Sequence, residues 1–89
     1  MTAPPTRDEV FAVVKEKIRE VLGDAISLES IRPEVALRDL GANSLDRVEI
    51  VSLSMQALAL RFPVRELGKV SNIGELVEAL HQKSEQRGT

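Results

Sequence analysis

Few side chains in this sequence could perform chemistry. There is no cysteine, which excludes a thiolate nucleophile, and the single histidine, His81, excludes a pair of histidine zinc ligands. We expect His81 at the surface of a helix, where no third group orients it as a base. The carboxylate pairs Glu16/Glu20 and Asp46/Glu49 suit solvated helix faces better than acid–base pairs, which need contrasting environments. The inventory therefore favours no catalytic scheme.

One serine, Ser44, stands where a loop gives way to a helical pattern. Helix N-termini present free N–H groups and a positive dipole end, so a phosphate on Ser44 would be favourably placed. Asp46 in the first turn also suits the dipole, and the small Gly41 and Ala42 would let another protein approach the backbone closely. Local pattern alone is explained more simply if Asn43 or Ser44 is only the N-cap, worth about 1 kcal/mol.

The elements that position Ser44 are predicted from periodicity. Thr6-Arg7-Asp8-Glu9 matches a capping box, and apolar residues then recur at helical spacing up to Gly23, which predicts a helix over residues 7–22. Residues 23–43 form a long connection, because Pro33 prevents a continuous helix. Five apolar residues are expected to pin this connection to the core: Ile26, Leu28, Ile31, Leu37 and Leu40.

A second helix is predicted from Leu45 to about Leu60, and it is apolar on nearly all sides. A domain this small cannot bury a whole helix, so part of it should be an exposed docking surface. That predicted surface comprises Leu45, Val48 and Met55, with Asn43, Asp46, Arg47 and Glu49 beside them. Leu45 and Val48 could instead belong to the core.

The remaining apolar positions of this second predicted helix are assigned by the same periodicity. The predicted core residues are Ile50, Val51, Leu58 and Phe62. Ser54, on the same side, could widen a cavity or hydrogen bond back to its own helix.

The rest of the chain completes an all-α fold. Pro63 begins a short helical turn over residues 64–67 that Gly68 ends, and Ser71 or Asn72 caps a last helix over about residues 73–83. Its apolar stripe comprises Ile73, Leu76, Val77 and Leu80. We predict an antiparallel four-helix bundle of three longer helices and one short helix. Residues 1–6 are predicted to be a disordered lead, 7–83 the domain and 84–89 a frayed tail.

Composition excludes several function classes. A hydrophobic fraction of 43% and a charged fraction of 29% are ordinary for a folded chain. A net charge of −2, with Phe11 and Phe62 as the only aromatic residues, argues against nucleic-acid binding. The sequence has neither an apolar run of about 20 residues nor a signal peptide. We expect a cytoplasmic monomer that binds neither nucleic acid nor membrane.

Over about residues 7–82, the order of elements around Ser44 resembles an acyl carrier protein. The resemblance rests on a capped amphipathic helix, a long loop, and then Leu40-Gly41-Ala42-Asn43-Ser44-Leu45-Asp46, followed by Val48-Glu49-Ile50. In that family the serine carries 4′-phosphopantetheine, which a phosphopantetheinyl transferase installs from coenzyme A. The resemblance implies that Ser44 is the attachment site, that the bundle is of acyl-carrier type, and that the chain has no turnover of its own.

The departures from the family concern charge. Asn43 replaces the usual aspartate, and Arg47 separates Asp46 from Glu49. The segment Met55-Gln56-Ala57 stands where fatty-acid carriers place acids that face basic enzymes. We infer that partner choice depends more on shape and apolar contact than on charge steering.

A narrower resemblance is to the freestanding donor carriers of polyketide β-branching cassettes. It rests on residues 43–50, on Pro63-Val64-Arg65-Glu66-Leu67 and on Asn72-Ile73-Gly74-Glu75-Leu76. Such carriers hold an acetyl group, generated from malonyl, for a hydroxymethylglutaryl-synthase-like enzyme. The resemblance implies as further partners an acyltransferase and a decarboxylating ketosynthase-like enzyme. Acceptor carriers commonly show a tryptophan after the serine, and this chain has none. We expect a freestanding protein, since the chain starts with Met1 and ends soon after the last helix.

Two alternatives stay open. The chain could be a carrier of ordinary polyketide or fatty-acid synthesis, although the acid-poor second helix counts against fatty-acid synthesis. It could also be an unmodified helical interaction module, in which Ser44 carries nothing and an exposed apolar helix binds a protein.

Overall fold

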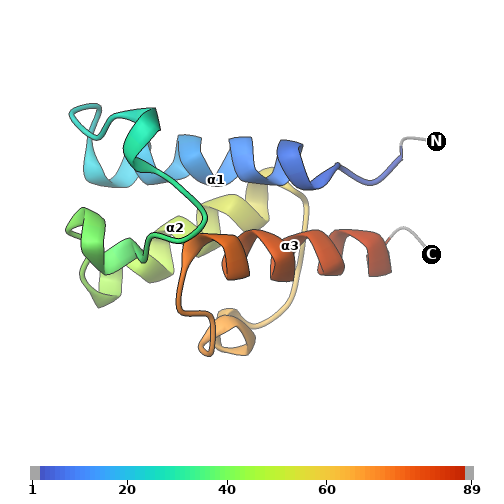
Figure 1. The fold of residues 1–89 in the computed structure, drawn as a ribbon. Coiled ribbons are helices and arrows are strands. Elements are labelled where there is room, and N and C mark those ends of the chain that lie inside the picture. The colour runs from blue at the N-terminus through green and yellow to red at the C-terminus, as the bar shows by residue number, and fades with distance from the viewer. Residues whose placement is uncertain (1–2, 88–89) are drawn as a thin grey trace.

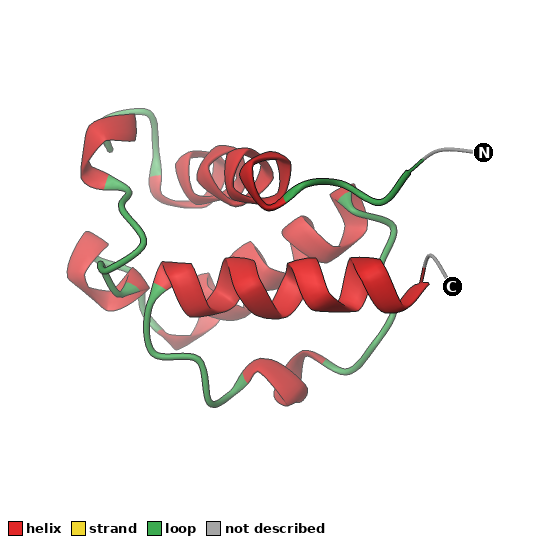
Figure 2. Cartoon of the chain, turned by 45° about the vertical axis from the view of Figure 1, so that its right-hand side comes forward, coloured by secondary structure: helices red, strands yellow, loops and turns green. Residues whose placement is uncertain are grey.

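The computed structural model describes residues 3–87, and for Arg87 its backbone only. Its helices are α1 (Arg7–Leu22), α2 (Ser44–Ala57) and α3 (Ile73–Arg87), with the short 3₁₀ turns η1 (Leu28–Ser30), η2 (Leu37–Leu40) and η3 (Val64–Leu67) between them. Within residues 3–87 there is no strand. α2 and α3 run in the direction opposite to α1 (Figure 1, Figure 2). The all-α fold with three longer helices is confirmed. The predicted short helix is the 3₁₀ turn η3, and two further 3₁₀ turns, η1 and η2, lie in the long connection.

The three helices meet along one apolar seam. The buried residues are Val10, Val14 and Ile18 of α1, Ile50, Val51 and Met55 of α2, and Ile73, Leu76, Val77 and Leu80 of α3. Each set recurs three or four residues apart, which places it on one helix face. None of the described helices is long and apolar enough to cross a membrane.

Helix α1 begins and ends where the sequence predicts. The Thr6 hydroxyl accepts a hydrogen bond from the Glu9 amide at 3.1 Å, and the Glu9 carboxylate accepts one from the Thr6 amide at 2.8 Å. Gly23 follows the helix with a φ of 107°, a conformation that favours glycine. Both caps satisfy backbone groups that the helix itself leaves without partners.

The long connection is fastened to the first turn of α3. The Ile73 amide donates to the Val35 carbonyl at 2.9 Å, and the Gly74 amide donates to the Pro33 carbonyl at 2.8 Å. Ile31 is buried, so the connection also reaches the core. Of the other predicted anchors, Ile26, Leu37 and Leu40 pack partly buried against that core.

Leu28 is the predicted anchor that proves wrong. Its side chain is 50% exposed. It lies beside Lys15, Glu16 and Arg19 on the polar outer face of α1, and Ile31 occupies the core position instead. Because Leu28 and Ile31 are both apolar, the sequence alone did not show which of them is buried.

Helix α2 is capped by Asn43 rather than by Ser44. The Asn43 side-chain oxygen accepts from the Asp46 amide at 2.8 Å, and the Asp46 carboxylate accepts from the Asn43 amide at 3.1 Å. Ser44 is the first helical residue. The preceding turn η2 ends at Gly41 with a φ of 94°, so this glycine is needed for the turn.

The two ends of α2 differ in burial. Leu45 is 79% exposed and Val48 51% exposed, which confirms them as surface residues. Met55 is only 6% exposed, so its predicted place in the docking surface is wrong. Seven residues separate it from Val48, which puts both on nearly the same helix face. Periodicity identifies that face, but the segments packed over its later turns decide which residue is buried.

The predicted core of α2 is largely confirmed. Ile50 and Val51 are buried, and Leu58 and Phe62 pack partly buried against the core. The Ser54 hydroxyl donates to the Ile50 carbonyl at 2.8 Å, which decides for the hydrogen bond back to the helix. The helix ends at Ala57, before the predicted Leu60, because Ala59 has a φ of 56° that breaks the helical path.

The last elements follow the sequence closely, with two differences. Asn72, not Ser71, caps α3, because its side chain accepts from the Glu75 amide at 2.8 Å. The helix continues to Arg87 rather than ending near residue 83, because Ser84 is buried and donates to the Leu80 carbonyl at 3.0 Å. Residues 1 and 2 of the predicted lead, and 88 and 89 of the predicted tail, lie outside the described residues.

His81 is less exposed than predicted. Its side chain is 14% exposed, and its Nδ1 lies 3.7 Å from a Glu85 carboxylate oxygen. The partial burial follows from its position next to Leu80, whose side chain is fully buried. The surface position expected for His81 is therefore wrong.

Replacing Gly74 with alanine tests the fastening of the connection. An added Cβ would lie 3.0 Å from the Pro33 Cβ and 3.1 Å from the Pro33 carbonyl oxygen. That carbonyl holds the Gly74 amide and cannot retreat without losing the bond. Alanine gains about 1 kcal/mol of helix propensity, but overpacking costs about 1–3 kcal/mol. We expect Gly74→Ala to lower the free energy of urea unfolding by about 1 kcal/mol. An unchanged or higher value would show that the connection yields; exposed Gln82→Ala is the control.

The assignment of the α2 cap is tested by a matched pair of neighbours. Asn43→Ala leaves the Asp46 amide without its acceptor, so we expect a loss of about 1 kcal/mol in urea unfolding. Ser44→Ala should change stability by less than about 0.5 kcal/mol, as for other surface substitutions. The reverse order of the two effects would identify Ser44 as the cap.

Candidate functional site

Helix α2, whose first residue is Ser44, begins at the end of the bundle opposite to the start of α1 and the end of α3 (Figure 1). The residue is exposed. In the part of the chain that the structure describes, its hydroxyl takes part in no hydrogen bond, whereas Asn43 and Asp46 on either side bond to each other. Capping and chemistry are thus divided between adjacent residues, and the Ser44 oxygen stays free to be modified.

The electrostatics at this point favour an anion. Ser44 occupies the first turn of a helix of 14 residues, where the positive end of the helix dipole lies. Arg47 stands one turn later on the same side, since residues three apart are neighbours on a helix. A phosphate on the Ser44 oxygen would therefore meet a favourable field.

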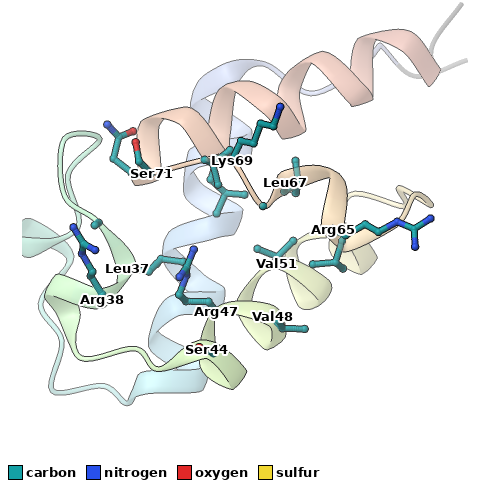
Figure 3. Close-up of a pocket in the computed structure, with 16 residues that line it drawn as sticks. Leu37, Arg38, Ser44, Arg47, Val48, Val51, Arg65, Leu67, Lys69 and Ser71 are labelled. Atoms are coloured by element: carbon teal, nitrogen blue, oxygen red, sulfur yellow. The ribbon is translucent and has the colours of Figure 1, made fainter.

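A half-open groove of about 660 Å³ begins at Ser44. Its walls come from η2, the first turns of α2, η3 and the segment that leads into α3 (Figure 3). An ion pair between Lys83 and Glu66, 2.9 Å long, ties η3 to α3. Leu37, Val51 and Leu67 give the groove an apolar floor.

The other predicted partner residues are distributed around Ser44. Leu45, Arg47, Val48 and Glu49 are exposed, as a partner surface requires. Asn43 is exposed too, but its side chain caps α2, and Asp46 is half-buried in the same cap. Met55 is buried and does not line the groove. Ala42 is 7% exposed, so it packs inward rather than opening the backbone to a partner.

Sequence reasoning missed the walls of the groove that lie outside α2. Arg38 comes from η2, Arg65 from η3 and Lys69 from the loop after it. Each stands in a short segment with no periodic pattern. No local signal places these residues beside Ser44, because only the packing of the segments brings them together.

The groove offers no group that could activate Ser44. Its lining contains no histidine, aspartate or glutamate, and no cluster of potential metal ligands occurs among the described residues. A serine without a nearby base is a weak nucleophile. The arrangement suits a serine that receives a group from another enzyme.

Comparison with known proteins agrees with this geometry. The family model described as "Phosphopantetheine attachment site" matches residues 12–80, which include Ser44 and every residue that lines the groove. The polyketide biosynthesis acyl carrier protein AcpK of Bacillus subtilis is 40% identical over 77 residues, which cover 86% of this chain and 93% of that protein.

Two further relatives are named acyl carrier protein. That of Clostridium acetobutylicum is 30% identical and covers 83% of this chain and 100% of its own length. That of Thermotoga maritima is 33% identical, and the match covers 88% of this chain and 95% of that protein. No solved structure matches the chain.

An exposed serine with an unbonded hydroxyl at a helix N-terminus, a family match over residues 12–80 and relatives named acyl carrier protein lead to one conclusion: this chain belongs to the acyl carrier proteins, which carry phosphopantetheine and catalyse no reaction themselves.

Proposed function

We propose that Ser44 is the residue that carries 4′-phosphopantetheine. Elimination among the serines within the matched residues 12–80 supports it. The hydroxyls of Ser27 and Ser30 bond to each other at 2.6 Å, and that of Ser71 donates to Glu75 at 2.8 Å. Ser54 is buried. Ser52 is half-buried in the middle of α2, away from the helix N-terminus. Ser44 alone combines an exposed, unbonded hydroxyl with the positive end of a helix.

The loading reaction is a transfer of a phosphoryl-linked group. The Ser44 oxygen bonds to the phosphorus that bears the pantetheine, the bond to the nucleotide phosphate breaks, and adenosine 3′,5′-bisphosphate leaves. The proton of the serine passes to a base of the phosphopantetheinyl transferase, since the groove holds none. The thiol of the arm then holds an acyl group as a thioester.

The pathway we favour is polyketide β-branching, with this chain as the donor. It would hold an acetyl group, formed from malonyl by an acyltransferase and a decarboxylating ketosynthase-like enzyme, and present it to a hydroxymethylglutaryl-synthase-like enzyme. Support comes from the similarity to a carrier of polyketide biosynthesis and from the lack of tryptophan in the chain. The exposed Leu45 and Val48 would contact these enzymes, with Arg47 and Glu49 beside them.

A carrier of fatty-acid synthesis is the second candidate. Its support is the similarity to two relatives named acyl carrier protein. Against it stands the end of α2, where Met55-Gln56-Ala57 provides no acid for a basic enzyme.

The attachment site is tested by intact mass after incubation with coenzyme A and a broad-specificity transferase. We expect the parent chain and Ser52→Ala to gain one phosphopantetheine each, and Ser44→Ala to gain none. Circular dichroism should show all three folded. A gain in Ser44→Ala would place the arm elsewhere, and no gain in any of them would favour the interaction module.

The pathway is tested by transfer from the loaded carrier. We expect the acetyl-loaded chain to donate its acetyl unit to a β-ketoacyl group on a second carrier when a hydroxymethylglutaryl-synthase-like enzyme is present. The mass of the second carrier reports the addition. Leu45→Ala should reduce the initial rate severalfold, because a truncated apolar anchor at an interface costs about 1 kcal/mol or more. Elongation by a fatty-acid ketosynthase, with no transfer in the first assay, would favour the second candidate.

A further inference from the structure

The groove beside Ser44 is lined by cations and by no acid. Arg38, Arg47, Arg65 and Lys69 line it, and neither aspartate nor glutamate does. The whole chain has a net charge of −2, so this positive character is local. It arises because residues from η2, α2, η3 and the following loop converge on one groove.

These four cations have no partner within the described residues. Elsewhere in residues 3–87, ion pairs join Arg7 to Glu78, Lys17 to Glu16 and Glu20, Arg32 to Glu34, and Lys83 to Glu66. Within residues 3–87 the side chains of Arg38, Arg47, Arg65 and Lys69 take part in no such pair, hydrogen bond or ring contact; their backbones form only local turn and helix bonds. Their charge is therefore available to a ligand.

Nearby carboxylates are held by the backbone instead. Asp39 accepts from the Ala36 amide at 3.2 Å, and Asp46 accepts from the Asn43 amide at 3.1 Å. Glu75 accepts from the amide and hydroxyl of Ser71, and these hydrogen bonds lower the pKa of Glu75. These acids form hydrogen bonds within their own segments, and none of them pairs with a cation of the groove.

The floor of the groove is apolar, and Arg47 rises from it. Figure 3 shows Arg47 between Leu37 and Val51, directed toward the middle of the groove, whereas Arg65 extends outward at one side. Ser44 lies one helical turn before Arg47 on α2. A ligand attached at Ser44 would thus find apolar contacts along its stem and a guanidinium for an anionic end.

We propose that this groove binds the acyl cargo of the arm when that cargo ends in a carboxylate, as a malonyl-type thioester does. Arg47 is its main partner and Arg38 borders the opposite wall. The proposal rests on the attachment of the arm at Ser44. Because the arm is tethered and its stem contacts the apolar floor of the groove, the ion pair adds to an intramolecular contact and does not have to hold a free ligand by itself. An acyl group with a neutral end gains no such contact and extends into solvent.

The experiment compares two cargoes of equal length, malonyl and acetoacetyl, of which only malonyl is charged. Each is loaded from its coenzyme A thioester by a broad-specificity transferase and checked by intact mass. If neither cargo can be loaded, the attachment of the arm at Ser44 is contradicted. The groove proposal is tested only with protein that has been loaded. Hydroxylamine cleavage of each thioester is then measured relative to the same acyl group on free pantetheine.

We expect malonyl to be protected about fivefold more than acetoacetyl, the factor that an ion pair of about 1 kcal/mol provides. Arg47→Gln should abolish the difference. Arg61→Gln should preserve it, because Arg61 is an exposed arginine that does not line the groove. Salt at about 1 M should also reduce the difference by screening.

Four results would overturn the proposal. Equal relative rates for the two cargoes would show that the charge is not bound. A difference that survives Arg47→Gln would remove the arginine from the contact. The amide resonances of the groove are compared in the malonyl-loaded protein and in the protein that carries the arm without an acyl group. If Arg47→Gln shifts them equally in both, the bound anion is the phosphodiester and not the malonyl carboxylate. If Arg47→Gln slows acyl transfer to a synthase but leaves the protection from hydroxylamine unchanged, the cations would instead bind an acidic surface of the partner enzyme.

Discussion

The two hydrogen bonds between the long connection and the first turn of α3 are the constraint on which the site depends. A connection of this length has a large conformational entropy to lose, and an unfastened one would not hold a wall of a groove. The carbonyls of Pro33 and Val35 satisfy amides that every helix leaves without partners in its first turn. The close contact of Pro33 with Gly74 fixes the same point sterically. The turn η2, which lines the groove with Leu37 and Arg38, follows directly after this fastened point.

The site also requires a serine hydroxyl that is not used to cap the helix. At the start of α2, Asn43 forms the cap and the neighbouring Ser44 does not. If the serine itself capped the helix, its hydroxyl would accept a backbone amide and modification would compete with stability. Asn43 performs that task, reciprocally with Asp46. An asparagine also supplies the capping oxygen without a charge, so it adds no repulsion next to a phosphodiester on Ser44. The departure from the aspartate usual in the family is thus compatible with the chemistry of the site.

Features that are local in the sequence were predictable, and features that depend on packing were not. The capping box at Thr6 and the turn at Val64–Leu67 are predictable because neighbouring residues determine them. The choice of Ser44 as the candidate attachment residue follows from the family resemblance and from its position at the start of a helical pattern. Leu28 and Met55 were misplaced because periodicity gives a face but not the segment that covers it. The groove was missed for the same reason. Charges counted along α2 alone suggested that charge matters little, but Arg38, Arg65 and Lys69 join Arg47 only in three dimensions.

The described chain enters α1 and leaves α3 at one end of the bundle, while α2, whose first residue is Ser44, begins at the other (Figure 1, Figure 2). A dye, a fused reporter or a solid support joined near Arg7 or near the end of α3 would leave the serine and its groove unobstructed. Such a bundle could be immobilised in a single orientation with its reactive end facing the solution. Successive enzymes could then be supplied and washed away while the same carrier molecules are followed through loading, exchange and release.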